Sequence, residues 1–262
     1  MTLGYVEFEF DLPEALLAKL VTVLDDVEPA PLLPDVVREV PEEQGVYQLF
    51  LRRQGKLEIV YIGKTDAESG LRDRLSRHAI KILNRVGLDP ADVLFKAVRV
   101  YVFTAVDLET QLIAHYGGVA RVNWNGSGFG SNDPGKERDT TTYKPDHFDT
   151  QFPIDMSKPI EFALPERGSA ALILKTLKRG LTYLLRFETS SRGSRLGHAD
   201  FENTPVMIDP AKPKTAESII AQVVAHLPAG WHATALPSHI IIYKNDNRKF
   251  PSGRLVARSS DR

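Results

Sequence analysis

The chain has 262 residues, of which 42% are hydrophobic and 26% charged, and it contains no cysteine. At roughly 100–200 residues per domain, this length predicts one large domain or two smaller ones. The lack of cysteine excludes disulfide bonds, thiolate catalysis and cysteine-based zinc sites. No apolar run approaches the roughly 20 residues of a membrane-spanning helix, and the acidic N-terminus is unlike a signal peptide. We therefore expect a cytoplasmic protein without a membrane partner.

The charge is distributed unevenly along the chain. Residues 1–44 carry 11 acidic and 2 basic side chains, a net charge of −9, and residues 45–155 carry 14 acidic and 15 basic side chains, a net charge of +1. Residues 156–262 carry 9 acidic and 16 basic side chains, a net charge of +7. This asymmetry suggests that the C-terminal part faces a polyanion, although an ordinary solvated basic surface would have the same charge.

The first half of the chain predicts short strands and helices. Leucines spaced along one side predict an amphipathic helix over 13–29. Two apolar runs, 46–51 and 57–62, flank a turn-forming segment that contains Gly55 and predict a β-hairpin. A helix, a strand and a second helix are expected next, at 71–86, 94–104 and 108–116. The predicted order after the first helix is ββαβα.

The second half begins with a polar stretch, 123–153, that is too long for an ordinary connection. Its aromatic residues favour an ordered, functional loop over a disordered one: Trp124, Phe129, Tyr143 and Phe148. A second, smaller α+β domain is expected beyond it, with helices at 168–179 and 214–227 and strands at 181–188, 231–236 and 239–243. We expect a linker at 189–203 and a disordered basic tail at 248–262.

Several residues that could carry chemistry have ordinary explanations when each is taken alone. Tyr47 and Tyr61 could be strand aromatics that fill the core. Arg74 and His78 are four residues apart on one helical face, as many surface pairs are. Glu109, near a helix start, could simply favour the helix dipole.

The order of these residues is more informative than any one of them. The chain contains Gly45-Val46-Tyr47, Tyr61-Ile62-Gly63-Lys64, Arg74 with His78, Glu109 and Asn123, in this order. On these motifs the chain resembles the GIY-YIG nuclease superfamily over about residues 40–150. The segment from Asn123, with GFGSNDPGKERD, resembles the branch of restriction endonucleases that cut a GC-rich palindrome. The resemblance implies an α+β fold whose ββαβα core is a small mixed sheet with flanking helices.

The resemblance also implies the catalytic roles of the first motif residues. A tyrosine would act as general base on the attacking water; Tyr47 is the first choice, with Tyr61 and His78 as alternatives. A phenol has a pKa near 10 and needs a neighbouring cation to ionise readily, which Lys64 could supply. Arg74 would hold the non-bridging phosphate oxygens through its planar guanidinium.

The remaining implied roles concern a metal ion and the phosphate. Glu109 would be the only protein ligand of a divalent metal, Mg²⁺ or Mn²⁺, with one ion in each active site. Asn123 would orient the phosphate or a metal-bound water, and Asn125 is an alternative because the spacing from Glu109 is slightly longer than the family's.

The preferred interpretation is a Mg²⁺-dependent, sequence-specific endonuclease of double-stranded DNA, a restriction enzyme. Its expected domains are an acidic helix and lead-in at 1–44, a catalytic domain at 45–155 and a basic, DNA-binding α+β domain at 156–262. Palindromic sites predict a homodimer, and a cognate DNA methyltransferase would act on the same site. The alternatives are a repair, mobile-element or phage-defence nuclease, and a DNA-binding module with an inactive core. The candidates for base contacts, or for phosphate contacts alone, are Arg138, Arg192 and Arg195.

Overall fold

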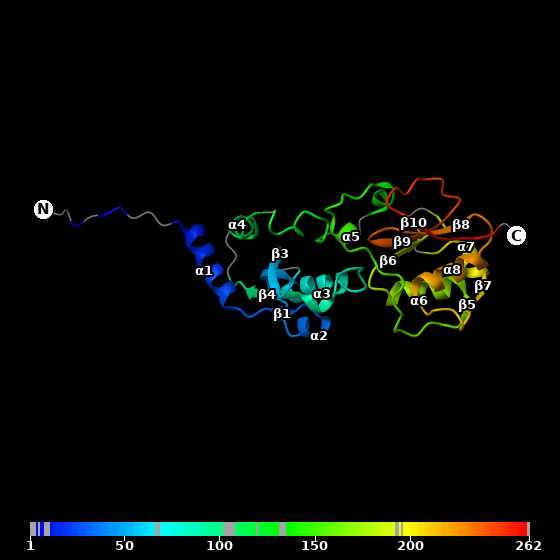
Figure 1. Ribbon diagram of the computed structural model, residues 1–262, viewed down its shortest axis with the longest axis horizontal. Helices are drawn as coiled ribbons and strands as arrows, with labels where there is room; N and C mark the ends of the chain where they lie inside the picture. Colours follow the sequence, from blue (N-terminus) through cyan, green and yellow to red (C-terminus); the bar gives the residue numbers. More distant parts are fainter. Residues whose placement is uncertain are drawn as a thin grey trace. The chain divides into compact units, whose positions relative to one another are not determined.

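A computed structural model of the chain describes residues 4, 6–7, 11–65, 69–101, 108–118, 120–130, 135–191, 194 and 196–260 (Figure 1). The chain forms two compact units. The first unit comprises Met1–Ile80 and Asp89–Gly126, and the second comprises Lys81–Leu88 and Ser127–Arg262. Each unit has its own sheet and helices, so the α+β class is confirmed. In the described part of the chain, no helix is both long and apolar enough to cross a membrane.

The first unit is built on a four-stranded sheet in the order β1-β4-β2-β3. β2 (Gly45–Arg53) and β3 (Lys56–Lys64) form the predicted hairpin, and its turn residues Gln54 and Gly55 have positive φ angles of 50° and 77°, as a tight hairpin turn requires. β4 (Val93–Arg99) pairs with β2, and β1 (Ala30–Pro31) pairs with β4. All these pairs are antiparallel, so the sheet is not the mixed sheet that the resemblance implies.

Helices cover both faces of this sheet. α1 (Leu12–Asp26) and α4 (Leu108–His115) share a core with Val46 and Ile62 on one face. Successive strand residues alternate between faces, so Tyr47 and Tyr61 point to the other face. There α3 (Leu71–Lys81) packs, beginning with Leu71 beside Gly45. The connections contain the short helices α2 (Pro34–Val37) and η1 (Pro90–Asp92).

Two predicted boundaries in this region are wrong. The helix predicted to reach residue 86 ends at Lys81, because Asn84 takes a positive φ of 51° that a helix cannot contain. The strand predicted to reach residue 104 ends at Arg99, which is the residue that pairs with Gly45, the first residue of β2. Residues 102–104 of that prediction lie outside the described residues.

The second unit has a four-stranded sheet in the order β10-β8-β9-β6. Its strands are β6 (Leu184–Phe187), β8 (Trp231–Ala235), β9 (His239–Lys244) and β10 (Arg254–Arg258). β6 and β9 are parallel, and the other pairs are antiparallel. The predicted disordered tail is therefore wrong in part, because β10 lies within it and pairs with β8.

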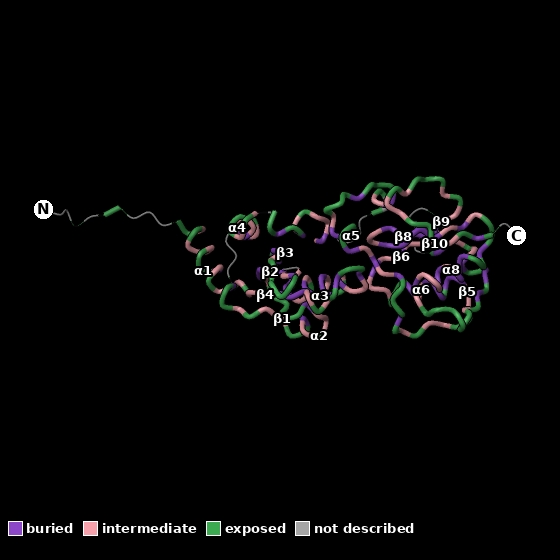
Figure 2. The backbone as a smooth tube through the Cα atoms, viewed as in Figure 1, coloured by how far each residue is buried: buried purple, intermediate pink, exposed green. Residues whose placement is uncertain are grey.

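One face of this second sheet carries the unit's main core. α6 (Ala170–Gly180) and α8 (Ala216–His226) pack there against alternate residues of β8 and β9, and buried segments mark this core in Figure 2. α7 (Ala199–Asn203) lies in the predicted linker, and β5 (Arg167–Ser169) pairs with β7 (Pro205–Met207). The polar stretch contains η2 (Lys136–Thr140) and α5 (Phe148–Gln151). Its aromatics Trp124, Phe129, Tyr143 and Phe148 are all buried, which confirms an ordered loop in the described part of that stretch.

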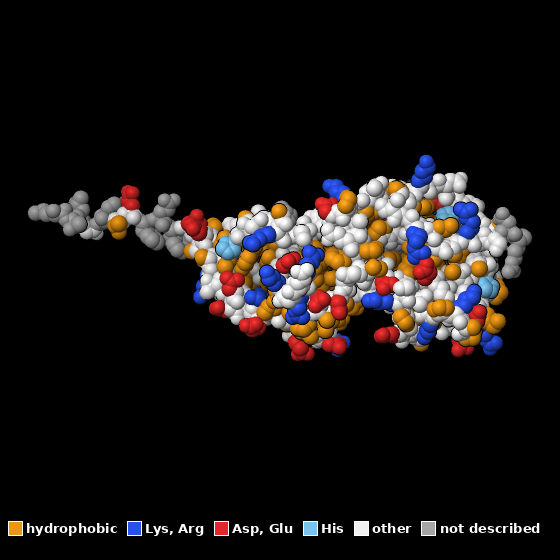
Figure 3. All heavy atoms as spheres, viewed as in Figure 1, with side chains coloured by type: hydrophobic (Ala, Val, Ile, Leu, Met, Phe, Trp, Pro, Cys, Tyr) orange, Lys and Arg blue, Asp and Glu red, His pale blue; other side chains and the backbone are white. Residues whose placement is uncertain are grey.

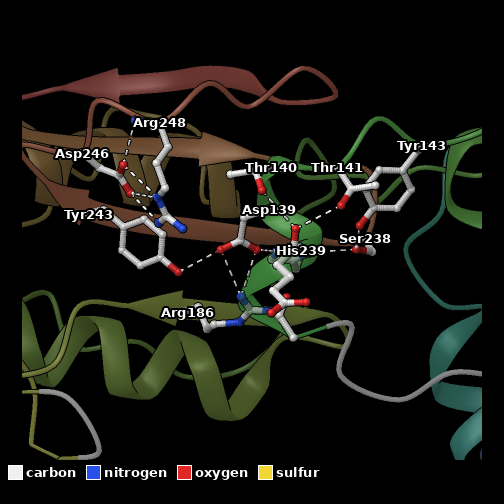
Figure 4. Close-up of polar contacts among 12 residues, drawn as sticks. Asp139, Thr140, Thr141, Tyr143, Arg186, Ser238, His239, Tyr243, Asp246 and Arg248 are labelled. Carbon is white, nitrogen blue, oxygen red and sulfur yellow. Dashed lines mark hydrogen bonds and ion pairs between the residues drawn. The ribbon is translucent and has the colours of Figure 1, made fainter.

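A buried carboxylate attaches η2 to the other face of the second sheet (Figure 4). The side chain of Asp139 is fully buried and accepts hydrogen bonds from Arg186 Nη1 at 2.9 Å, His239 Nε2 at 2.7 Å and Tyr243 Oη at 3.1 Å. Arg186 lies on β6, and the other two donors lie on β9. This contact, together with the buried pair of Arg85 and Asp149 at 2.7 Å, places 127–155 in the second unit and not in the predicted catalytic domain.

Replacing Asp139 by alanine should destabilise the second unit by about 3–5 kcal/mol, because it leaves Arg186, whose side chain is only 12% exposed, without its carboxylate. Urea unfolding of the full chain measures this loss. Glu202→Ala is the matched control, because Glu202 forms an ion pair of 2.7 Å with Lys175 at the surface, and we expect it to cost less than about 1 kcal/mol. Equal losses for the two variants would contradict the structural role of Asp139.

The pH dependence of unfolding gives a second measurement. Burial raises the pKa of Asp139, but the hydrogen bond from His239 and the charge of Arg186 outweigh it and hold the pKa below the ordinary 3.8. Since the folded state favours the carboxylate, this contribution is present above about pH 4 and is lost as the pH falls through the lowered pKa. Asp139→Asn should therefore lose less stability in acid than the unsubstituted chain.

Candidate active site

Two tyrosines lie side by side on the face of the first sheet that α3 covers. Tyr47 on β2 is opposite Gly63, and Tyr61 on β3 is opposite Leu49, so the tyrosines are diagonal neighbours on one face. Their rings stack with centroids 6.0 Å apart and an angle of 29° between planes. Tyr47 is fully buried, and Tyr61 is 7% exposed. The two strands of the hairpin thus bring both motif tyrosines to one place.

Steric contacts explain why both motifs have glycine at positions 45 and 63. A Cβ atom on Gly63 would lie 2.4 Å from both Oη and Cζ of Tyr47, because the ring crosses directly over that glycine. A Cβ atom on Gly45 would lie 2.3 Å from the carbonyl oxygen of Val98 and 2.6 Å from Cδ1 of Leu71. Only glycine permits these close approaches: Gly63 makes room for the Tyr47 ring, and Gly45 makes room for β4 and for the first residue of α3.

α3 adds two side chains to the tyrosine pair. Nε2 of His78 lies 2.8 Å from Oη of Tyr47, and the imidazole centroid is 5.6 Å from the Tyr47 ring and 5.3 Å from the Tyr61 ring. Arg74 precedes His78 by one helical turn and is half-buried. The charge of its guanidinium lowers the pKa of both phenols, so Arg74 is the cation that acts on the pair.

Burial and charge oppose each other at the two phenols. Burial raises the pKa of Tyr47 far above its ordinary value of 10.0, the neighbouring Tyr61 raises it further, and Arg74 lowers it only in part. Burial also raises the pKa of Tyr61, and the second cause is the negative charge of Glu109. Both hydroxyls are therefore protonated near neutral pH. The carboxylate of Glu109, in the first turn of α4, is close enough to Tyr61 to act on it.

The structure thus assembles five of the predicted site residues and leaves two others aside. Tyr47, Tyr61, Arg74, His78 and Glu109 act on one another as described above. Lys64 is exposed at the end of β3, where it pairs with Val46. By strand alternation it lies on the face opposite to Tyr61 and Gly63. Asn123 is exposed in the turns that follow α4.

Asn125, the alternative to Asn123, has a clear structural role. Its Oδ1 accepts a hydrogen bond from the backbone N–H of Ile62 at 2.9 Å, and its Nδ2 donates to the carbonyl of Ile62 at 2.8 Å. The N–H of Trp124 donates to the carbonyl of Val60 at 2.8 Å. The side chain of Asn125 therefore satisfies the backbone N–H and carbonyl of Ile62 at the outer edge of β3, as a neighbouring strand would.

Of the predicted base-contacting arginines, only Arg138 is among the described residues, and it belongs to the second unit. Nη1 of Arg138 lies 3.1 Å from Nε2 of His147, and its guanidinium lies 5.5 Å from the centroid of the Tyr143 ring. Arg192 and Arg195 lie outside the described residues. The sequence patterns gave no sign of the pair formed by Asp246 and Arg248 in the second unit; only their spacing of two residues hints at it.

The donor set at Tyr61 fits a divalent metal held by one carboxylate. Within the described ranges, no group of three or more histidine, aspartate or glutamate side chains could form a cage. Glu109 offers hard oxygen atoms, and Mg²⁺ commonly takes one or two carboxylates and retains several waters. A cation at Glu109 would also offset the negative charge that raises the pKa of Tyr61.

Comparisons with known proteins found no family model and no curated protein that matches the chain.

Proposed function

We propose that this protein is a metal-dependent, sequence-specific endonuclease that hydrolyses phosphodiester bonds in double-stranded DNA, with a GIY-YIG type of core in its first unit. One observation carries the proposal. Tyr47 and Tyr61 stack beside His78 of α3, and the charges of Arg74 on α3 and Glu109 on α4 act on these phenols. A group of this composition has an acid–base path, a cation for the phosphate and a carboxylate for a metal, which are the three requirements of the reaction.

The acid–base path runs through the buried hydroxyls. Because Tyr47 is protonated, its hydroxyl can donate to Nε2 of His78, 2.8 Å away. In this path, Tyr47 passes its hydroxyl proton to His78, and the phenolate that results accepts a proton from the attacking water. The charge of Arg74, which favours the phenolate form of both tyrosines, lowers the cost of that transfer.

The charged residues serve the phosphate. Arg74 can hold non-bridging phosphate oxygens with its planar set of donors. Glu109 would hold Mg²⁺ or Mn²⁺, which when bound supplies positive charge to the phosphate and the leaving oxygen.

Cutting both strands of a palindrome requires two such sites, so we propose a homodimer. A methyltransferase specific for the same DNA site is the partner expected to protect the host's own DNA.

The direct test is incubation of the full chain with plasmid DNA and Mg²⁺, with EDTA as the control. Discrete fragments that disappear in EDTA support the proposal, and sequencing of the ends gives the site and stagger. A smear indicates a nuclease with structural or no sequence specificity, of the repair, mobile-element or phage-defence kind. Intact DNA that is nevertheless bound indicates a DNA-binding module.

The tyrosine hydroxyls can be tested one at a time. Tyr47→Phe removes the group within 2.8 Å of His78 and should lower the single-turnover cleavage rate about 100- to 10,000-fold, the usual contribution of a general base. Tyr116→Phe is the control, because the Tyr116 hydroxyl bonds to Asp25, at 3.1 Å, and not to the site. If Tyr47→Phe cleaves as fast as Tyr116→Phe, the proton path through Tyr47 is wrong; a loss confined to Tyr61→Phe would assign the base to Tyr61.

A further inference from the structure

The connection between β9 and β10 carries an arginine that is held in one orientation (Figure 4). Nε of Arg248 donates to both carboxylate oxygens of Asp246, each at 2.9 Å, and Nη2 donates to Oδ2. The backbone N–H of Arg248 also donates to Oδ1 of Asp246, at 2.9 Å. The hydrogen bonds from Arg248 lower the pKa of Asp246 below its ordinary value, so the pair is ionised at neutral pH.

Aromatic rings complete the support of this guanidinium. Its central carbon lies 5.3 Å from the centroid of the Tyr243 ring and 5.5 Å from that of Phe250, both within cation–π range. The side chain of Asp246 is only 12% exposed, whereas that of Arg248 is 43% exposed. Asp246 occupies the Nε edge, so the opposite edge, with Nη1 and the second N–H of Nη2, is the one available to a ligand.

The connection after β9 lines two open clefts. One cleft, of about 930 Å³, is also lined by Thr189, Ser190 and Ser191, and the other, of about 520 Å³, by His232 and Arg258. The segment 245–248 lines both. The lining also includes the carboxylates of Glu188 and Asp246, and its hydroxyl, amide and cationic side chains are of the kind that contact DNA bases and phosphates.

Other exposed arginines of the chain show that an ion pair alone does not produce this arrangement. Arg254 pairs with Glu217, whose side chain is 38% exposed, and Arg38 pairs with Asp35, whose side chain is 84% exposed. No aromatic ring among the described residues is within cation–π range of either arginine. When a carboxylate fixes one edge of a guanidinium, the two N–H donors of the other edge are already oriented toward solvent. Such an arginine loses little conformational freedom when it binds a ligand. It therefore suits a flat ligand with two neighbouring acceptors.

Guanine in the major groove offers such a pair of acceptors, O6 and N7, and bidentate contact with arginine is the commonest specific contact in protein–DNA complexes. Residues 156–262 carry a net charge of +7, which favours approach to DNA, and Figure 3 shows lysine and arginine side chains interspersed with aspartate and glutamate on the visible face of the second unit. We propose that Arg248, positioned by Asp246 and supported by Tyr243 and Phe250, reads a guanine of the DNA bound by the second unit. This inference rests on the proposed function and names one specificity-determining residue for it.

The test uses the full chain with Glu109→Gln, which should bind DNA without cutting it. The protein selects from a library of duplexes randomised at the central positions, and the bound fraction is sequenced. Arg248→Ala should reduce the preference for guanine about 10- to 100-fold at one position of each half-site and leave the other positions unchanged. Arg254→Ala is the matched control, since it removes the same charge from an arginine without the aromatic support, and it should leave the preferences unchanged.

Replacing Asp246 by alanine separates base reading from simple attraction. The substitution removes a negative charge, so an Arg248 that only attracts phosphate would bind all duplexes as well or better. A guanine-reading Arg248 would lose its fixed orientation, and the guanine preference should fall by about tenfold or more. Thermal unfolding of each variant checks that the second unit is still folded.

Three outcomes would overturn the inference. Sequence preferences for Arg248→Ala equal to those of the parent chain would exclude base reading. An equal loss for every duplex, with the slope of log K against log salt reduced by about 0.9, would make Arg248 a phosphate contact. If the chain with its active site intact cuts plasmid but Arg248→Ala gives the same fragments, only this inference fails. If it neither binds nor cuts DNA, the proposed function itself fails.

Discussion

Replacing Glu109 by glutamine should abolish DNA cleavage and leave DNA binding unchanged or tighter. Glutamine has nearly the same shape but cannot supply the carboxylate charge that would hold a divalent metal. Charge stabilisation by such a metal contributes several kcal/mol to the transition state, and each 1.36 kcal/mol is a factor of ten in rate, so we expect a loss of at least about 100-fold. Binding should not suffer, because the substitution removes a charge that repels phosphate.

A readout independent of cleavage comes from Tyr61. The charge of Glu109 raises the pKa of the Tyr61 phenol, so the Gln variant should show a lower pKa for that phenol in a spectroscopic titration. Glu14→Gln is the matched control, because Glu14 is likewise in the first turn of a helix, α1. The metal assignment is wrong if Glu109→Gln cleaves within tenfold of the unsubstituted chain, and the proximity of Glu109 to Tyr61 is wrong if the phenol titrates unchanged.

Local sequence signals predicted most elements of the first unit. The hairpin of β2 and β3 follows from two apolar runs around a turn, and α1 and α4 follow from helical spacing of leucines. The division into units could not be predicted in this way. It depends on Asp139, whose partners Arg186 and His239 lie 47 and 100 residues later. It also depends on the buried pair of Arg85 and Asp149, 64 residues apart.

These long-range contacts also limit what can be deleted. A truncation that removed residues 156–262 would leave Asp139 and Tyr143 without the partners they have on β6, β9 and Ser238. Both side chains are buried in the second unit. The segment 127–155 would then expose a face that the full chain covers, so single substitutions such as Arg248→Ala test DNA binding by this unit better than truncation does.

The candidate site was predictable in part because its residues follow a known order of motifs. Lys64 is one position after Gly63, and strand alternation puts it on the opposite face of the sheet from Tyr61. The alternation of side chains along this strand could be deduced from the sequence. The role of Asn125 could not be deduced, because its bonds to Ile62 bridge 63 residues. The support of Arg248 by Phe250 and Tyr243 likewise depends on how the connection after β9 folds back.

Three arginines on α3 could serve the phosphate, and their contacts distinguish them. Arg72 donates to the carbonyl of Val40 at 2.7 Å and to Glu42 at 3.0 Å. Arg77 donates to Ser69 and Asp73 at 2.7 and 2.8 Å. Arg74 is the one whose charge lowers the pKa of both site phenols. Arg72 and Arg77 are thus engaged by backbone and side-chain acceptors outside the tyrosine pair, and Arg74 is the arginine that we propose for the phosphate.

Arg74→Ala should therefore lower the single-turnover cleavage rate about 100- to 1,000-fold, the loss typical for one preorganised donor to a developing charge, while DNA affinity changes far less. Arg74→Lys should recover little of that rate, because a compact ammonium cannot reproduce two parallel hydrogen bonds to phosphate oxygens. Arg77→Ala is the control on the same helix and should cleave within about tenfold of the unsubstituted chain. Removing Arg74 should also raise the pKa of Tyr61 further, since its charge opposes the effects of burial and Glu109. Full activity in Arg74→Lys, or a larger loss in Arg77→Ala than in Arg74→Ala, would assign the phosphate to another arginine of α3.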